Sequence, residues 1–206
     1  MTTRLFVAIW PSAAAGEALA HTVDAARRVA PDVRWQPPER WHITLAFLGA
    51  ADPTKAGARI DALARADRAP GAEPLSLHRS GSFGPVIWIG VEHGPWLADL
   101  AHGLQRSLHV ADRRFRAHVT VGRARGADGP ARARDVVPSL AAHDGPAWTP
   151  SGITLVESVT GPAPEYHVLA RWPLRRPAAD PSTVPPNRDT TSGAVRDSGI
   201  PTLEEP

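Results

Sequence analysis

The stretch Trp41-His42-Ile43-Thr44-Leu45-Ala46-Phe47-Leu48-Gly49 decides the interpretation of this chain, because it sets a polar pair inside an apolar strand. Its first part recurs further on as His118-Val119-Thr120-Val121. Residues i and i+2 of a strand share a face, so each imidazole is expected beside a threonine hydroxyl. Two such strands brought together would gather two histidines and two threonines. This set of side chains is suited to paired acid/base chemistry on a phosphate group.

Length and composition indicate one folded domain with a tail. The chain has 206 residues, of which 42% are hydrophobic, as in ordinary globular domains. We predict a folded domain over residues 1–176 and a disordered tail over 177–206, which is rich in Pro, Ser and Thr. No stretch approaches the roughly 20 apolar residues of a membrane span. The first residues do not resemble a secretory signal, so a cytoplasmic protein is expected.

The charged residues narrow the function classes only a little. The formal net charge is +2, which does not indicate wholesale coating of nucleic acid. Lys55 is the sole lysine among 23 basic residues, and arginine is the better bidentate phosphate donor. Coding bias gives the same composition, so arginine abundance alone decides nothing. Cysteine is absent, which excludes disulfides, thiolate metal sites and cysteine nucleophiles.

Apolar patterning predicts short strands that alternate with helices. Strands are expected over residues 5–10, 41–48, 75–80, 86–91, 118–123, 153–160 and 166–172, and helices over 12–28, 52–68, 95–109 and 131–141. Several consecutive strands have short connectors, which favours an α+β fold with antiparallel sheet. Each His-x-Thr strand precedes a helix and a further strand. This weak repeat predicts a bilobal molecule, with two antiparallel-sheet lobes, outer helices and pseudo-two-fold symmetry around a central cleft.

Several segments, in order, resemble the 2H phosphoesterase superfamily, in its RNA 2′,3′-cyclic phosphodiesterase branch (also called the 2′-5′ RNA ligase family). The resemblance covers most of residues 3–174 and departs from the family pattern at Ala117, where proline is common. The matching segments are Arg4–Ile9, Val33–Trp35, His42–Gly49, Phe83–Gly84, Trp88–Val91, Phe115–Arg123 and a closing stretch with Glu157, Ser158, Gly161, Tyr166 and Leu174.

The resemblance implies hydrolysis of a terminal 2′,3′-cyclic phosphate to a 2′-phosphomonoester by metal-independent, two-histidine catalysis. By the family pattern His42 is expected as the proton donor and His118 as the proton acceptor, although the opposite order stays open. Histidine suits both roles because its pKa lies near neutrality. Thr44 and Thr120 are expected to donate hydrogen bonds to the non-bridging oxygens. No cofactor and no metal is expected.

Three further residues are candidates for binding the substrate. Arg123 follows His118 at the spacing of a family arginine and is expected to bind the phosphate. Strict alternation puts it on the opposite face, unless a bulge at Gly122 reverses that face. Trp35 and Tyr166 are candidates for stacking on a base, with a core position as the alternative for Trp35.

The expected partner is RNA with a 2′,3′-cyclic phosphate end, bound by a monomer without a membrane. One alternative is a phosphodiesterase that acts on a small cyclic nucleotide or an ADP-ribose cyclic phosphate. Another is a non-catalytic protein that binds RNA ends. The two intact histidines argue against a protein that only binds RNA ends, because binding requires hydrogen-bond donors and not two side chains that titrate near neutral pH. His102 and His109 lie too far apart on one helix to share a metal ion.

Overall fold

The computed structural model describes residues 2–66, 71–111, 114–160 and 165–175. Its strands form one antiparallel sheet in the order β4-β5-β6-β3-β1-β7-β8, with β2 paired to β6. The predicted α+β class is confirmed, while the predicted tail lies outside the described residues. The strands are β1 (Thr2–Ile9), β2 (Arg34–Trp35), β3 (Ile43–Gly49), β4 (Ser76–Phe83), β5 (Val86–Glu92), β6 (His118–Arg123), β7 (Gly152–Thr160) and β8 (Glu165–Pro173).

The two predicted lobes are two halves of this sheet. One half contains β4, β5, β6 and β2, and the other contains β3, β1, β7 and β8. They meet through one register pair, Ile43 of β3 with Val119 of β6. The pseudo-two-fold relation between the halves stays a prediction.

Four helices are described: α1 (Ala13–Val29), α2 (Pro53–Arg65), α3 (Pro95–Ser107) and α4 (Gly129–Val136). Three of them begin as predicted: α3 begins at Pro95, and side chains cap the starts of α1 and α2. The Ser12 hydroxyl accepts a hydrogen bond from the Ala15 amide, and the Asp52 carboxylate caps α2. Such caps satisfy amides that have no partner within the helix. None of the described helices is long and apolar enough to cross a membrane.

The helix predicted over residues 131–141 is shorter than expected. The α-helix ends at Val136, and the 3₁₀ segment η2 (Val137–Leu140) follows it. Pro138 explains the break, because proline lacks the amide hydrogen that would continue the helical bonding. A second 3₁₀ segment, η1 (Pro38–Arg40), lies in the predicted turn before β3.

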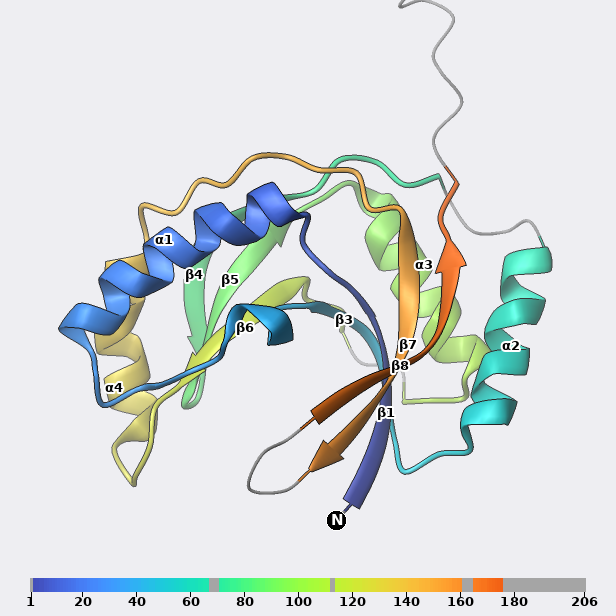
Figure 1. Cartoon of the computed structure of the whole chain (residues 1–206), viewed down its shortest axis with the longest axis horizontal. Coiled ribbons are helices and arrows are strands. Elements are labelled where there is room, and N and C mark those ends of the chain that lie inside the picture. The colour runs from blue at the N-terminus through green and yellow to red at the C-terminus, as the bar shows by residue number, and fades with distance from the viewer. Residues whose placement is uncertain (1, 67–70, 112–113, 161–164, 176–206) are drawn as a thin grey trace, which may run out of the picture.

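The helices cover one face of the sheet and leave the other to the motif residues. Figure 1 shows α1 and α4 beside β4 and β5, with α2 and α3 at the other side of the molecule. Along β1, the side chains of Leu5, Val7 and Ile9 join the main hydrophobic core. Phe6 and Ala8 alternate with them and form a separate small cluster. That second face is the one that carries the candidate site.

Candidate active site

The two His-x-Thr motifs meet in the middle of the sheet. Ile43 pairs with Val119, and each of these buried residues is the centre of its motif. In an antiparallel pair, this register sets His42 across from Thr120 and His118 across from Thr44. Because neighbouring residues of a strand point to opposite faces, these polar residues lie away from the main core.

Each histidine is held in the same way by a backbone carbonyl. The Nδ1 atom of His42 lies 2.7 Å from the Arg40 carbonyl oxygen, and Nδ1 of His118 lies 2.7 Å from that of Arg116. A carbonyl oxygen only accepts hydrogen bonds, so both Nδ1 atoms carry the hydrogen. Nε2 is therefore the nitrogen of each ring that can take up or release a proton.

Aromatic rings support both imidazoles. His42 stacks on Phe6 at a centroid distance of 4.7 Å and meets the edge of Tyr166 at 5.6 Å. His118 meets Phe83 edge-on at 5.2 Å. These contacts restrict the orientation of each ring, which is needed for directed proton transfer.

The same two arginines that hold the histidines also lie over these rings. The Arg40 guanidinium is 5.9 Å from the centre of the Tyr166 ring, and that of Arg116 is 5.7 Å from the centre of Phe83. Guanidinium groups over aromatic faces form cation–π contacts. Arginine, aromatic ring and histidine thus form one arrangement that occurs on both sides of the site.

Burial changes the proton affinity of one histidine. The pKa of His42 is lowered from 6.5 to about 4. Burial is the main cause, the hydrogen bond to the Arg40 carbonyl opposes it, and the charge of His118 adds to the lowering. His42 is therefore neutral at pH 7 while no anion is bound. A bound phosphate would raise its pKa, because a nearby negative charge favours the imidazolium.

Two hollows open beside the motifs. The first, which we call the arginine hollow, has a volume of about 450 Å³ and is lined by His42, Thr44, Thr120 and residues that include Arg4, Gln36, Arg40, Arg123, Ser158 and Tyr166. The second, which we call the phenylalanine hollow, has a volume of about 500 Å³ and is lined by Thr44, His118 and residues that include Phe47, Phe83, Gln105, Val110, Ala111, Arg114, Phe115 and Arg116. Thr44 and Phe47 line both hollows.

A β-bulge brings Arg123 to the arginine hollow. Gly122 of β6 pairs with Ile87 and Thr120 pairs with Trp88, so Val121 is one residue extra. An extra residue reverses the alternation that follows it. Arg123 therefore lines the same hollow as Thr120, and its contact with a phosphate stays a prediction. The extra residue, Val121, lies one position before Gly122, where a bulge was considered from the sequence.

The two candidate stacking residues have different surroundings. Tyr166 lines the arginine hollow, and burial raises the pKa of its hydroxyl. The indole nitrogen of Trp35 donates a hydrogen bond to the Ala30 carbonyl at 2.9 Å. The Trp35 ring packs over Gly122 and against the main core. We therefore keep Tyr166 as a candidate contact and regard Trp35 as a packing residue.

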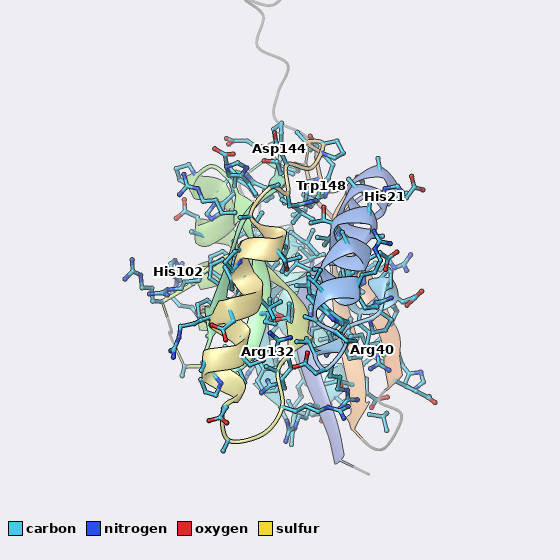
Figure 2. The ribbon with its side chains drawn as sticks, turned by 90° about the vertical axis from the view of Figure 1, so that its left-hand side faces the viewer. His21, Arg40, His102, Arg132, Asp144 and Trp148 are labelled. Atoms are coloured by element: carbon cyan, nitrogen blue, oxygen red, sulfur yellow. The ribbon has the colours of Figure 1, made fainter. Side chains whose placement is uncertain are left out.

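The other histidines lie elsewhere. Figure 2 shows His21 and His102 on opposite flanks of the molecule. The side chain of His143 is buried, and its Nδ1 lies 2.9 Å from the Thr22 hydroxyl. Within the described ranges, no three His, Cys, Asp or Glu side chains are grouped closely enough to hold a metal ion.

Comparison with known proteins gives the family. A family model described as LigT like Phosphoesterase matches residues 9–88, which include the first motif. A curated RNA 2′,3′-cyclic phosphodiesterase of Methanothermobacter thermautotrophicus is 30% identical over 141 residues, covering 61% of this chain and 73% of the relative. The chain belongs to the LigT-like phosphoesterase family.

Two further matches support this membership. A protein of Geobacillus stearothermophilus with the same curated name is 27% identical over 179 residues, which cover 82% of this chain. The match spans 56% of that relative's length. The crystal structure of Escherichia coli LigT complexed with 3′-AMP superposes with a TM-score of 0.65 at 28% identity, covering 85% of this chain and 100% of LigT.

Several residues of this LigT-like site are not predicted by the sequence patterns. Phe47, Phe83 and Phe6 were not expected there, because their positions depend on strand pairing. Arg40 and Arg116 could have been found, since each precedes a motif histidine by two residues. The repeated pattern is therefore Arg-x-His-x-Thr rather than His-x-Thr alone.

Proposed function

We propose that this protein hydrolyses RNA 2′,3′-cyclic phosphate ends to 2′-phosphomonoesters by two-histidine acid/base catalysis that needs no metal ion. The observation that carries the proposal is the matched pair of imidazoles. Both rings have Nδ1 bonded to a carbonyl, which leaves Nε2 for proton transfer, and both adjoin a motif threonine in a hollow. The curated names of two relatives give the substrate class.

The reaction requires two proton transfers at opposite sides of the phosphorus. One neutral histidine removes a proton from water as its oxygen attacks the phosphorus. The bond from phosphorus to the ribose 3′-oxygen breaks, and the other histidine, as imidazolium, gives that oxygen a proton. Thr44 and Thr120 donate hydrogen bonds to the non-bridging oxygens, and Arg123 neutralises their charge.

His42 is the proposed proton donor and His118 the proposed acceptor. This order requires the bound phosphate to raise the pKa of His42 well above its value of about 4 in the empty cleft. The reverse order uses His42 in its neutral form without that change. The two orders predict different responses of the single-histidine variants to a change of leaving group.

RNA is favoured over a small cyclic nucleotide by the exposed basic residues around the hollows. Arg4 and Arg123 are exposed beside the arginine hollow, and Arg114 and Arg116 are exposed beside the phenylalanine hollow. Arginines that extend beyond one phosphate site suit a polyanion.

The test is ³¹P NMR of an oligoribonucleotide with a 2′,3′-cyclic phosphate end, incubated with the protein in excess EDTA. Conversion to a 2′-phosphomonoester is expected for wild type and for His21→Ala, an exposed control on α1. With His42→Ala or His118→Ala, the ³¹P signal of the 2′,3′-cyclic phosphate is expected to persist. A persistent cyclic signal with wild type would reject the RNA-end assignment and favour a small cyclic nucleotide or binding alone.

A further inference from the structure

A third hollow opens where β1 ends, β7 begins and β8 ends. We call it the tryptophan hollow; it has a volume of about 540 Å³, and its lining includes Trp10, Ser12, Trp148, Thr154, Arg171 and Trp172. Trp10 connects this hollow to the candidate site, because the centre of its ring lies 5.5 Å from that of His42. A ligand in the tryptophan hollow would therefore contact a side chain that itself contacts a motif histidine.

A β-bulge brings Arg171 to this hollow. Leu169 of β8 has no partner in β7, because the register shifts there by one residue. Arg171 comes opposite Thr154, which in turn pairs with Ala8 of the small open-face cluster. An extra residue reverses the alternation that follows it. Arg171 therefore lies on the open face of the sheet, as Arg123 does after the bulge in β6.

The tryptophan hollow combines an accessible indole with one unopposed positive charge. Trp10 is partly exposed, whereas Trp148 and Trp172 belong to the main core. Arg171 is exposed and is the only charged residue in the lining of the hollow. No acidic side chain of the described ranges forms an ion pair with it. An indole face suits a nucleobase and a guanidinium suits a phosphate, so the hollow has the chemistry of a nucleotide site.

The proposed proton donor gives the direction in which the RNA leaves the site. As donor, His42 lies next to the ribose 3′-oxygen, while the attacking water and His118 lie on the opposite side of the phosphorus. The 3′ carbon is bonded to the 4′ carbon, which carries the 5′ carbon and the rest of the RNA. The upstream part of the strand therefore leaves on the side of His42, where Trp10 contacts the imidazole.

We propose that the tryptophan hollow binds the penultimate nucleotide of the RNA. Its base stacks on Trp10, and Arg171 binds the phosphate that joins it to the terminal nucleotide. This inference rests on the proposed function, with His42 as the donor. It implies that the protein distinguishes an RNA end from a free mononucleotide by the nucleotide next to the cyclic phosphate.

Calorimetry on the full chain tests this subsite without turnover. The probes are adenosine 2′-phosphate, the dinucleotide ApA with a 2′-phosphate end, and the same dinucleotide without its upstream base. Stacking and a phosphate contact each strengthen binding. Wild type is expected to bind the dinucleotide at least about ten-fold more tightly than the mononucleotide, with the abasic dinucleotide between them. Equal dissociation constants for the dinucleotide and the mononucleotide would overturn the inference.

Two variants separate the base from the phosphate. Trp10→Leu removes the indole and is expected to bring the dinucleotide and its abasic form within about two-fold of each other. Arg171→Gln removes the charge and is expected to bring the abasic dinucleotide within about two-fold of the mononucleotide, while the preference for the base persists. Because Arg171 is exposed, this variant decides the matter even if Trp10→Leu does not fold.

The matched control is Arg65→Gln, at an exposed position on α2 outside the tryptophan hollow. It removes the same charge and is expected to keep both differences between the probes. Equal losses in Arg171→Gln and Arg65→Gln would show only a general effect of net charge and would overturn the inference. So would wild-type differences between the probes in both Trp10→Leu and Arg171→Gln.

Hydrolysis separates failure of the inference from failure of the proposed function. If adenosine 2′,3′-cyclic phosphate and the cyclic dinucleotide are hydrolysed with equal kcat/KM and their products bind equally, only the inference is wrong. If neither is hydrolysed, the proposed function fails, while the calorimetric differences still decide whether the hollow binds a nucleotide.

Discussion

The side-chain amide of Gln105, on α3, donates a hydrogen bond of 3.0 Å to the main-chain carbonyl of Leu45. Leu45 is an extra residue of β3, with no partner in β1, and follows Thr44 directly. Gln105 is buried, and its Oε1 has no partner among the described residues. A helix on the covered face of the sheet thereby holds the bulge that shapes the open face.

The first prediction concerns this contact. Gln105→Glu is expected to lose at least about 2 kcal/mol of unfolding free energy at pH 8, because a buried carboxylate would face a carbonyl oxygen. At pH 5 the loss relative to wild type is expected to shrink, since a protonated carboxyl can donate the hydrogen bond. Denaturant titration measures both values. Arg106→Ala, the exposed neighbour, serves as control, and a pH-independent loss in Gln105→Glu would refute the contact.

The second prediction concerns the bulge at Val121. Because the bulge turns Arg123 into the arginine hollow, Arg123→Ala is expected to lower kcat/KM for cyclic phosphate ends by about 10- to 100-fold, the value of a charged hydrogen bond. Arg125→Ala, also exposed and two residues further on, should stay within about two-fold of wild type. Similar losses in both variants would show that the bulge has no such effect.

The motif residues of this site can be predicted from the sequence. The other residues of the site cannot, because their positions depend on how the strands pair. The His-x-Thr pattern gives the four motif residues because it depends only on alternation within one strand. Arg123 and Phe47 depend on bulges, and these arise where two strands of different length must match. The contact of Phe83 with His118 joins segments that no local pattern relates.

The third prediction follows from the pKa of His42, which burial lowers from 6.5 to about 4. Above pH 6.5 the residue is neutral in both the folded and unfolded states and adds no pH dependence. Between pH 6.5 and 4, His42 is protonated in the unfolded chain but stays neutral in the folded protein. The free energy of unfolding therefore falls as the pH falls toward 4. The full effect is at most about 3 kcal/mol.

Denaturant titrations from pH 7.5 to 4 measure this effect. His42→Gln should lose less stability than wild type over that interval. Burial lowers the pKa of His143 as well, but that residue contributes equally to both proteins. Parallel curves for wild type and His42→Gln would mean that His42 is not desolvated in the fold.

The fourth prediction separates the proton donor from the acceptor. A substrate with sulfur in place of the ribose 3′-oxygen leaves as a thiolate, which needs no proton because a thiol has a pKa of about 8.5. If His42 is the donor, this substrate should restore most of the activity of His42→Ala and none of that of His118→Ala. Rescue of His118→Ala alone would reverse the proposed order. Stopped-flow detection of the released thiol measures both rates.

The central claim is that His42 and His118 act as one acid/base pair, and a double-mutant cycle on hydrolysis of the cyclic phosphate tests it most directly. Rates in EDTA are compared for wild type, His42→Ala, His118→Ala and the double variant. When two residues act as a unit, the effects of mutating each of them do not add up in the double variant. We predict that each single variant loses about 10²- to 10⁴-fold and that the double variant loses little more than either. Near wild-type activity in one single variant, or losses that multiply in the double variant, would contradict the account.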